Sequence, residues 1–206
     1  MDKKDKNMNK LKVLVIVDAQ NDFISGSLAN QEAQAAIPAI LEKIKNFDGD
    51  AIFLTMDTHQ KNYLQTPEGE KLPVEHCIYG TKGWGINEQV RDAVEARELL
   101  GMKVEYITKP TFGSVESTVA CEKSLTELIL DMELKAAHEA SKKVEMEIEM
   151  CGFCTDICVI SNALILKAYT YDFAEITVDS TCCAGVTPEK HNAALEVMKS
   201  CQINVI

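Results

Sequence analysis

Six short runs of apolar and β-branched residues recur along this chain, and segments long enough for a helix separate them. The runs are KVLVIVD from residue 12, AIFLTMD from 51, VEYITK from 104, VEMEIEMCG from 144, AEITVDS from 174 and INVI at the end. Strands that alternate with helical segments form βαβ crossovers, and parallel strands covered on both faces have nearly continuous apolar sequences. The pattern therefore predicts a three-layer α/β/α fold around a mostly parallel six-stranded sheet, a Rossmann-like architecture.

The segments between these runs carry the signals of amphipathic helices. Residues 31–46 and 157–169 place apolar side chains at helical spacing. The stretch TPEKHNAALEVMKS from residue 187 opens with threonine, proline and an early glutamate, which predicts a helix start. Residues 58–88 fit no element, and irregular loops of that length inside a compact domain are often functional.

The chain is long enough for one sizeable core. It has 206 residues, of which 46% are hydrophobic, and its sequence shows no internal repeat or domain linker. We expect residues 1–10 to form a disordered polar tail and residues 11–206 to form a single domain. The acidic stretch 131–150 carries no recognisable chemistry.

Charge and hydropathy argue against several kinds of partner. The chain holds 32 acidic against 21 basic residues, a net charge of -11, whereas nucleic-acid binding depends on clustered lysine and arginine. No apolar run approaches the roughly 18 residues that span a bilayer. These features predict a cytoplasmic protein that has no nucleic-acid or membrane partner. In a reducing compartment, most of the eight cysteines would be free thiols.

Titratable residues stand at the ends of the expected strands. Asp18 closes the first strand, Asp57 the second and Lys109 the third. A cysteine cluster follows the fourth, and Ser180 begins the polar end of the fifth. Ligands of open parallel sheets bind outside the carboxyl ends of the strands. We therefore expect the functional site at this edge.

Three interpretations fit the cysteines of MCGFCTDICVIS at residues 150–161. A structural zinc site needs four ligands, but the second pair, Cys182 and Cys183, is adjacent in sequence and would chelate poorly. A redox pair needs its CxxC at a helix start, whereas Cys151 still lies within the expected strand. The third interpretation, a single nucleophile, is favoured for Cys158.

Cys158 is expected where a thiolate would be stabilised. Gly152 ends the strand, Thr155 or Asp156 can cap the next helix, and Cys158 then falls in the first turn of that helix. Free N–H groups there could also hold an oxyanion. The alternative is a buried structural cysteine.

Asp18 and Lys109 are candidate partners of this thiol. A partly desolvated Asp18 could accept the thiol proton and pass it to a leaving amine. Lys109 precedes Pro110 and therefore leaves its strand in an extended conformation, and its cation would lower the pKa of the thiol. The alternatives are a capping aspartate and a solvated lysine.

The long loop supplies candidate metal ligands. Asp57 and His59 occupy alternate positions of an extended segment, and Glu68 and His76 follow in the loop. Histidines combined with carboxylates suit Zn²⁺ first, with Mn²⁺ and Fe²⁺ as alternatives. The competing interpretation is loop capping by Asp57 together with exposed histidines.

Aromatic residues flank these positions. Phe23, Trp84 and Phe112 could wall an aromatic pocket, although core packing is the usual role of such side chains. His138 and His191 lie in charged helical stretches, and we expect both to be solvated.

Six segments form an ordered set that covers nearly the whole chain. They are VIVDAQNDF at 15–23, TMDTH at 55–59, LPVEHC at 72–77, TKPTFGS at 108–114, GFCTDICV at 152–159 and STCCAGVTP at 180–188. In order and spacing this set resembles the cysteine hydrolases of the isochorismatase-like superfamily, and within it the nicotinamidases. The resemblance implies the isochorismatase-like hydrolase fold.

The resemblance also implies roles for individual residues. It implies a catalytic triad of Asp18, Lys109 and Cys158, with Cys158 as the nucleophile. It implies a cis peptide bond between Phe153 and Cys154, which would let the N–H groups of Cys154 and Cys158 form an oxyanion hole.

A metal site is implied as well. Asp57, His59 and His76 match the metal ligands of the family, and Glu68 falls where some nicotinamidases supply a fourth. Several relatives have a further histidine where this sequence has Asn62 and Tyr63. This departure leaves the coordination number open.

The implied reaction is the hydrolysis of nicotinamide to nicotinate and ammonia through a thioester on Cys158, a step of NAD salvage, with the ring between Phe23 and Trp84. Isochorismatases of the same fold lack the nucleophilic cysteine, so Cys158 favours amide chemistry. One alternative is another C–N hydrolase, such as an N-carbamoyl amide or ureido hydrolase. The other is a non-catalytic binding protein that senses metals or thiol oxidation. Because relatives are often homo-oligomers, we expect one here, with 188–200 and 119–143 as candidate contact surfaces.

Overall fold

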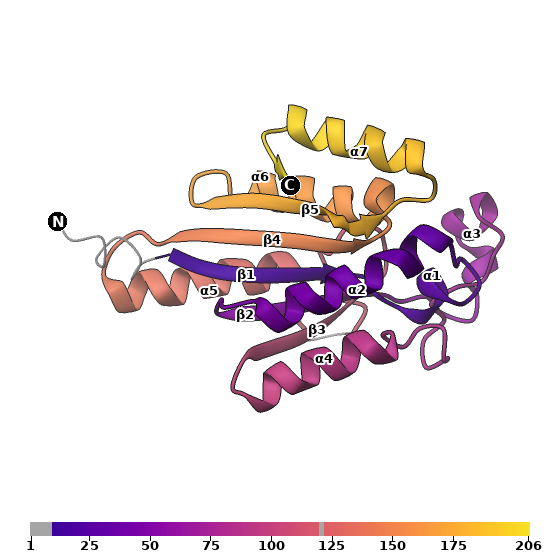
Figure 1. Ribbon diagram of the computed structural model, residues 1–206, viewed down its shortest axis with the longest axis horizontal. Coiled ribbons are helices and arrows are strands. Elements are labelled where there is room, and N and C mark those ends of the chain that lie inside the picture. Colours follow the sequence, from indigo (N-terminus) through magenta and orange to yellow (C-terminus); the bar gives the residue numbers. More distant parts are fainter. Residues whose placement is uncertain (1–9, 120–121) are drawn as a thin grey trace.

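The computed structural model describes residues 10–119 and 122–206 of the chain. Its centre is one sheet with the strand order β3-β2-β1-β4-β5-β6, in which all paired strands are parallel (Figure 1). The strands are β1 Lys10–Val17, β2 Ala51–Asp57, β3 Lys103–Lys109, β4 Glu145–Phe153, β5 Ala174–Ala184 and β6 Asn204–Val205. The predicted six-stranded sheet is confirmed.

Helices cover both faces of this sheet (Figure 1). On one face, α2 (Gln31–Asn46) and α4 (Glu88–Leu99) pack against each other, and α5 (Leu125–Ala140) and α6 (Ile160–Tyr169) lie on the other. α7 (Pro188–Ser200) packs against α6. The predicted three-layer fold is therefore confirmed. Among the helices of the described residues, none combines the length and apolar character needed to cross a bilayer.

The central strands are apolar on both faces because helices cover both. Val13–Val17 of β1 and Ala51–Leu54 of β2 have no exposed surface. Ile37, Ile40 and Ile44 recur at helical spacing in α2 and are buried in the same core. Burial of each such side chain contributes about 1.5–3 kcal/mol. This packing fixes the strands, and with them the side chains at their carboxyl ends.

Short helices and the long loop gather near the carboxyl ends of the strands. The short helices are α1 Asn21–Ile24, η1 Tyr63–Gln65, α3 Pro67–Lys71 and the π-helix η2 Thr155–Val159. Residues 58–88 contain only η1 and α3 before α4 begins. Isolated bridges pair His59 with Ile78 and Gln20 with Ile86. The long loop is therefore folded back onto the end of the sheet (Figure 1).

Some boundaries differ from the sequence-based expectation. β1 begins at Lys10, inside the segment 1–10 that was expected to be a tail, and residues 1–9 lie outside the described part. β5 continues to Ala184, so Ser180 lies within the strand rather than at its end. The helix start expected at residue 187 is confirmed, because Thr187 caps α7.

Candidate active site

Four neighbouring strands of the sheet bring one reactive side chain each to the same edge. In sheet order these are Lys109 at the end of β3, Asp57 at the end of β2, Asp18 directly after β1 and Cys158 in η2 after β4. All four side chains are buried. The structure thus brings together the strand-end residues that the sequence singled out.

The ammonium group of Lys109 is the centre of this group. Its Nζ lies 2.8 Å from Asp18 Oδ2, 3.4 Å from Asp57 Oδ1 and 3.6 Å from Cys158 Sγ. Nζ also donates a hydrogen bond of 3.0 Å to the carbonyl oxygen of Thr111. Because Lys109 has no exposed surface, its charge depends on these partners.

Asp18 is held beside Lys109 by β2. The hydroxyl of Thr55 donates to Asp18 Oδ1 at 2.7 Å, and the Asp18 N–H donates to the Thr55 carbonyl at 3.1 Å. Burial raises the pKa of Asp18 above its usual 3.8, although Lys109 opposes the shift. The Asp18 carboxylate is therefore a better proton acceptor than an exposed aspartate.

Burial also dominates the titration of the thiol. It raises the pKa of Cys158 well above the usual 9.0, and the lowering by Lys109 that the sequence predicted offsets only part of this. Burial therefore favours the neutral thiol of Cys158 over the thiolate. Desolvation opposes the charge of Lys109, but the carboxylates of Asp18 and Asp57 outweigh it and raise the pKa of Lys109 well above 10.5.

Hydrogen bonds fix the turn that carries Cys158. Asn162 Nδ2 donates to the carbonyl oxygens of Cys158 at 2.8 Å and Phe112 at 3.1 Å. Its Oδ1 accepts a hydrogen bond of 2.9 Å from the Ser114 N–H. Asn162 thus joins η2 to the loop after β3, so the nucleophile candidate and Lys109 are held by one network. The peptide bond between Phe153 and Cys154 is cis, as the resemblance implied.

The N-cap predicted at Thr155 or Asp156 is wrong. The hydroxyl of Thr155 shares a hydrogen bond of 2.8 Å with His191 Nδ1, and Asp156 Oδ1 accepts one of 2.8 Å from the Val186 N–H. Both side chains therefore connect η2 to α7 and to the turn before it. The contact leaves His191 only partly exposed, so its predicted solvation holds only in part, whereas His138 is exposed.

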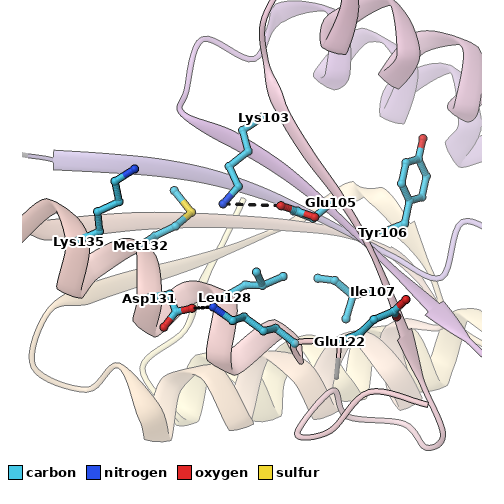
Figure 2. A pocket seen from close by; sticks show the side chains of 10 residues that line it. Lys103, Glu105, Tyr106, Ile107, Glu122, Leu128, Asp131, Met132 and Lys135 are labelled. Carbon is cyan, nitrogen blue, oxygen red and sulfur yellow. Dashed lines mark hydrogen bonds and ion pairs between the residues drawn. The ribbon is translucent and has the colours of Figure 1, made fainter. Parts of the chain in front are cut away.

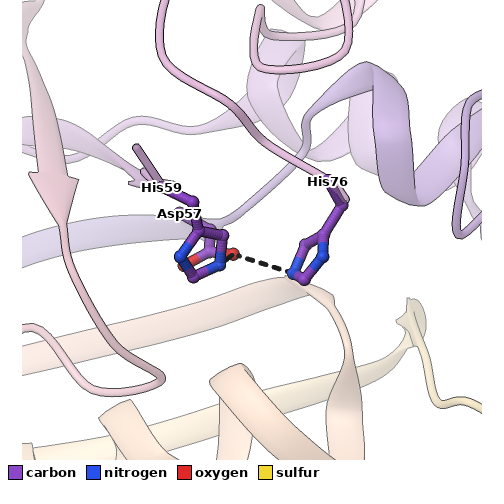
Figure 3. A group of neighbouring side chains, drawn as sticks. All are labelled: Asp57, His59 and His76. Atoms are coloured by element: carbon purple, nitrogen blue, oxygen red, sulfur yellow. Dashed lines mark ion pairs between the residues drawn. The ribbon is translucent and has the colours of Figure 1, made fainter. Parts of the chain in front are cut away.

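Asp57, His59 and His76 form a compact cluster next to Lys109. His59 Nε2 lies 2.9 Å from Asp57 Oδ2, and His76 Nε2 lies 3.4 Å from the same oxygen (Figure 3). One ligand atom from each residue lies within 4.8 Å of the others. Glu68 Oε1 is 3.6 Å from His59 Nε2 and 3.8 Å from His76 Nε2. The structure thus brings together all four predicted ligands.

The donor set of this cluster fits a divalent cation. His76 Nδ1 lies 2.9 Å from the carbonyl oxygen of Val74, a contact that assigns the ring proton to Nδ1 and leaves Nε2 as the free ligand atom. His59 Nε2 is buried, and its 2.9 Å contact with Asp57 Oδ2 lacks the geometry of a hydrogen bond. Burial opposes the ionisation of Asp57, but Lys109 and the two histidines outweigh it and lower the pKa of Asp57. Two imidazole nitrogens beside an ionised carboxylate are suitable ligands for Zn²⁺.

Tyr63 packs against the cluster without adding a nitrogen ligand. Its ring centroid lies 4.6 Å from that of His59 and 4.9 Å from that of His76. The Tyr63 hydroxyl donates to the carbonyl oxygen of Leu72 at 3.0 Å. Asn62 is exposed. The position at which several relatives have another histidine is therefore used here for packing.

Gln20 is a site residue for which no role was predicted from the sequence. Its Nε2 donates to the carbonyl oxygens of Asp57 and Trp84, both at 2.8 Å, and its Oε1 accepts from the Asp57 N–H at 2.8 Å. The side chain has no exposed surface. One signal in the sequence could have revealed Gln20. It is a polar residue two positions after Asp18, close to the end of an apolar strand. Gln20 holds the backbone of Asp57 on both sides.

A cavity of about 730 Å³ opens beside these residues. Asp57, Glu68, His76 and Cys158 line it together with Phe23. Cys154 and Phe112 also contribute to its wall. The thiol and the metal-ligand candidates Asp57, Glu68 and His76 therefore face one common space.

Trp84 does not line this cavity, although it was predicted to contact the substrate. Its indole N–H donates to Thr58 Oγ1 at 2.9 Å, and its ring lies 4.9 Å from that of Tyr79. The prediction failed because a position within the irregular loop 58–88 does not set the direction of a side chain. Phe23, the other predicted aromatic residue, does line the cavity.

A second hollow lies between β3 and α5, away from these groups (Figure 2). Lys103 Nζ lies 3.9 Å from Glu105 Oε1, and Lys123 pairs with Asp131. No cysteine or histidine is among its lining residues. The acidic segment that begins at Asp131 thus contributes to surface ion pairing here.

Fold and site together define an α/β protein of the isochorismatase-like class. The chain belongs to the isochorismatase family, because the family model described as "Isochorismatase domain" matches residues 12–206. The family membership inferred from the ordered segments is therefore confirmed.

Relatives with known sequences and structures agree with this assignment. An isochorismatase family protein of Bacillus subtilis, PncA, is 29% identical over 189 residues, which cover 89% of this chain and 92% of that protein. The crystal structure of the nicotinamidase/pyrazinamidase PncA of Bacillus subtilis matches with a TM-score of 0.71 and 27% identity, over 95% of this chain and 98% of that one. The pyrazinamidase of Pyrococcus horikoshii, solved in complex with zinc, matches with a TM-score of 0.63 and 27% identity, over 95% and 98% of the two chains.

Proposed function

We propose that this protein is a nicotinamidase, an amidohydrolase that converts nicotinamide to nicotinate and ammonia. One observation carries the proposal: Lys109 Nζ lies 3.6 Å from Cys158 Sγ and 2.8 Å from Asp18 Oδ2, beside a cavity shared with the histidine cluster. A thiol, a proton acceptor and a fixed cation are the groups that nucleophilic catalysis by cysteine uses. The relatives named nicotinamidase and pyrazinamidase support the choice of an aromatic carboxamide.

In the first half of the proposed reaction, Cys158 becomes acylated. Asp18 takes the thiol proton, and Sγ attacks the carboxamide carbon. The N–H groups of Cys154 and Cys158 stabilise the oxyanion, each donor lowering the barrier by about 3 kcal/mol. Asp18 then gives the proton to the departing nitrogen, so the C–N bond breaks, ammonia leaves and a thioester to Cys158 remains.

In the second half, water hydrolyses the thioester. Asp18 accepts a proton from the attacking water, the carbon–sulfur bond breaks, and the proton returns to the sulfur of Cys158. Nicotinate leaves, and the enzyme is restored. The raised pKa of Asp18 suits it to both proton transfers, which typically accelerate such reactions about 10²–10⁴-fold. Lys109 stays protonated throughout and offsets the negative charge that moves between Asp18 and Cys158.

The metal site belongs to the same proposal. Asp57, His59 and His76, with Glu68 as a fourth ligand, would hold Zn²⁺. When bound, the ion supplies a Lewis acid that can fix the pyridine nitrogen of the substrate. Phe23 in the cavity wall would contact the ring.

Ammonia release from nicotinamide tests the proposal. Cys158→Ala should lower kcat/KM by at least about a thousandfold, because the residue forms the covalent intermediate. Cys201→Ala, at an exposed cysteine, is the matched control and should keep wild-type activity. Full activity of Cys158→Ala would contradict the mechanism.

Two further measurements separate the alternatives. Faster hydrolysis of N-carbamoyl amides or ureido compounds than of nicotinamide would assign the chain to another C–N hydrolase class. Zinc binding without hydrolysis of any amide would indicate a binding protein. The homo-oligomer, the cytoplasmic location and the place in NAD salvage stay predictions.

A further inference from the structure

The cavity is larger than the proposed substrate needs. Its volume of about 730 Å³ lies in the range of sites that bind drug-sized ligands. Nicotinamide is a single ring with one carboxamide. With the carboxamide at Cys158 and the ring nitrogen at the histidine cluster, a bare ring would fill only the inner part of this space.

Three apolar side chains surround the outer part of the cavity. Leu72 is 36% exposed, Phe112 is 42% exposed and Val186 is 43% exposed, and all three line the cavity. They come from segments far apart in sequence: the end of α3, the loop after β3 and the turn before α7. Apolar side chains that converge from separate loops on a cavity mouth mark a binding surface more strongly than scattered ones do.

The two ends of the cavity differ in chemistry. The inner end presents the Cys158 thiol, the carboxylate of Asp57 and the His76 imidazole. The outer end presents the apolar side chains of Leu72, Phe112 and Val186, with Lys71 and Lys190 beside them. A ligand that satisfies both ends needs a polar, reactive group joined to an apolar extension.

We propose that Leu72, Phe112 and Val186 form an apolar collar that binds a hydrocarbon substituent on the ring of the substrate, so that alkylated aromatic carboxamides are better substrates than nicotinamide itself. The inference rests on the proposed function, whose inner site it extends. The collar residues would act through burial of apolar surface and take no part in the bond changes.

Two lysines at the same mouth offer a competing chemistry. Lys71 and Lys190 line the cavity and are exposed. A substituent that carries a carboxylate would be attracted to these cations. Exposed charge pairs typically contribute only about 0–1 kcal/mol, whereas each buried methylene contributes about 0.8 kcal/mol. The apolar substituent is therefore the stronger expectation.

The test is a series of nicotinamides with hydrogen, methyl, ethyl or propyl at the free meta carbon, the ring carbon that is bonded to neither the ring nitrogen nor the carbon bearing the carboxamide. In the zinc-loaded enzyme, kcat/KM should rise two- to fourfold with each added carbon, the upper limit corresponding to about 0.8 kcal/mol per buried methylene. Phe112→Ala, Leu72→Ala and Val186→Ala should each reduce the ratio of kcat/KM for the propyl compound to that for nicotinamide. Leu99→Ala, at a leucine 89% exposed and outside the cavity, should leave that ratio unchanged.

Binding to the Cys158→Ala protein provides a second readout that needs no turnover. The dissociation constants of the same compounds, measured by calorimetry, should fall along the series in parallel with the rise in kcat/KM. This measurement keeps the collar testable even if the chemistry differs from the one proposed.

The outcomes separate the two proposals. Hydrolysis of nicotinamide with a flat or falling alkyl series would overturn the collar and leave the proposed function standing. A preference for a carboxylated ring over the propyl compound would also overturn the collar. It would indicate that Lys71 and Lys190 bind the substituent at the mouth of the cavity. If collar variants instead dissociate an oligomer and the alkyl series is flat, the surface binds a second copy and the inference is wrong. Absence of hydrolysis with every amide would overturn the proposed function, and affinities that do not rise with alkyl length would then overturn the collar as well.

Discussion

At the scale of single residues, the site depends on a lysine that has no contact with water. Lys109 lies 2.8 Å from Asp18 and 3.4 Å from Asp57, and both carboxylates are almost completely buried. Removing the cation would leave Asp18 without its charged partner and Asp57 with only the two histidines. A buried pair that loses one partner typically costs about 3–5 kcal/mol.

The first prediction concerns this lysine. Lys109→Met keeps the apolar stem but removes the charge, and we expect the free energy of unfolding to fall by about 3 kcal/mol. Lys142→Met, at an exposed lysine of the described chain, should change it by less than about 0.5 kcal/mol. Urea titration followed by circular dichroism measures both. Equal stability of the two variants would show that the carboxylates do not need Lys109.

Gln20 leads to a second prediction. Gln20→Ala removes three hydrogen bonds of 2.8 Å to the backbone around Asp57 and Trp84, and the Asp57 carboxylate would lose its fixed position. Loss of such supporting partners lowers metal affinity about 10–100-fold. Competition with a fluorescent chelator measures zinc affinity without reference to turnover. Gln89→Ala, at an exposed glutamine of α4, is the control, and equal affinities of the two variants would contradict the supporting role.

The third prediction follows from the raised pKa of Asp18. In the proposed mechanism Asp18 must be ionised to accept the thiol proton, so activity should be lost as the pH falls through its pKa. Because burial raises that pKa above 3.8, the acidic limb of kcat/KM should lie above the range of an exposed aspartate. Profiles at saturating zinc, with the fold checked by circular dichroism at each pH, provide the measurement. An acidic limb at the usual value would contradict the role given to Asp18.

Residue types and spacing predicted much of the site, but not every role. Asp18, Lys109 and Cys158 could be found because each lies at or after the carboxyl end of a strand, where parallel sheets bind their ligands. The direction of the Trp84 side chain and the contacts of Gln20 depend on how the long loop folds back, and no local pattern encodes that. The raised pKa of Cys158 was not predictable either, because it results from burial that only the assembled structure provides.

At the scale of elements, the turn after β4 shows why local signals can fail. Thr155 and Asp156 have the side chains that cap helices, yet both bind partners from the region of α7, and the first turn is the π-helix η2. Tertiary contacts therefore outweigh capping preference here. The strands and α2 were predictable because their apolar periodicity agrees with the packing that buries them.

The fourth prediction concerns Gly152, the residue that lets β4 approach β1. Its φ is 119°, and a Cβ there would lie 2.0 Å from the carbonyl oxygen of Val17. Gly152→Ala should therefore destabilise the protein by more than Gly101→Ala, whose φ is 93° but whose Cβ would meet nothing within 4 Å. We expect about 1 kcal/mol for the strain at Gly101 and at least about 3 kcal/mol at Gly152. Urea unfolding of both variants measures the difference, and equal losses would show that β4 can move away from β1 without cost.

At the scale of the whole molecule, the site is assembled by the sheet and closed by the long loop. The sheet brings Lys109, Asp57, Asp18 and Cys158 side by side, and the loop returns His76 to the same place. The sequence predicted that the site lies at this edge of the sheet, because the carboxyl ends of parallel strands meet there. The path of residues 58–88 was not predictable, since most of that segment has no repeating pattern.

The fifth prediction concerns zinc and overall stability. A ligand that binds only the folded state stabilises it, by about 2.7 kcal/mol at a concentration 100 times the dissociation constant. Zinc should therefore raise the Tm of the wild-type protein, and chelation should reverse the effect. His59→Ala should abolish the shift, whereas His138→Ala, at an exposed histidine, should retain it. A shift of equal size in both variants would place the ion elsewhere.

The place of β3 in the sheet has a further consequence. β3 is an outermost strand that pairs with β2 alone, yet it ends at Lys109, whereas Asp18 and Cys158 follow the interior strands β1 and β4. Edge strands open locally, and so exchange their amide hydrogens, more readily than interior strands do. Fraying of β3 would move the Lys109 ammonium group away from Asp18 and Cys158 while the rest of the molecule stays folded. Warming should therefore abolish activity at a lower temperature than it unfolds the whole protein. The active site would then be disrupted first at the edge strand β3.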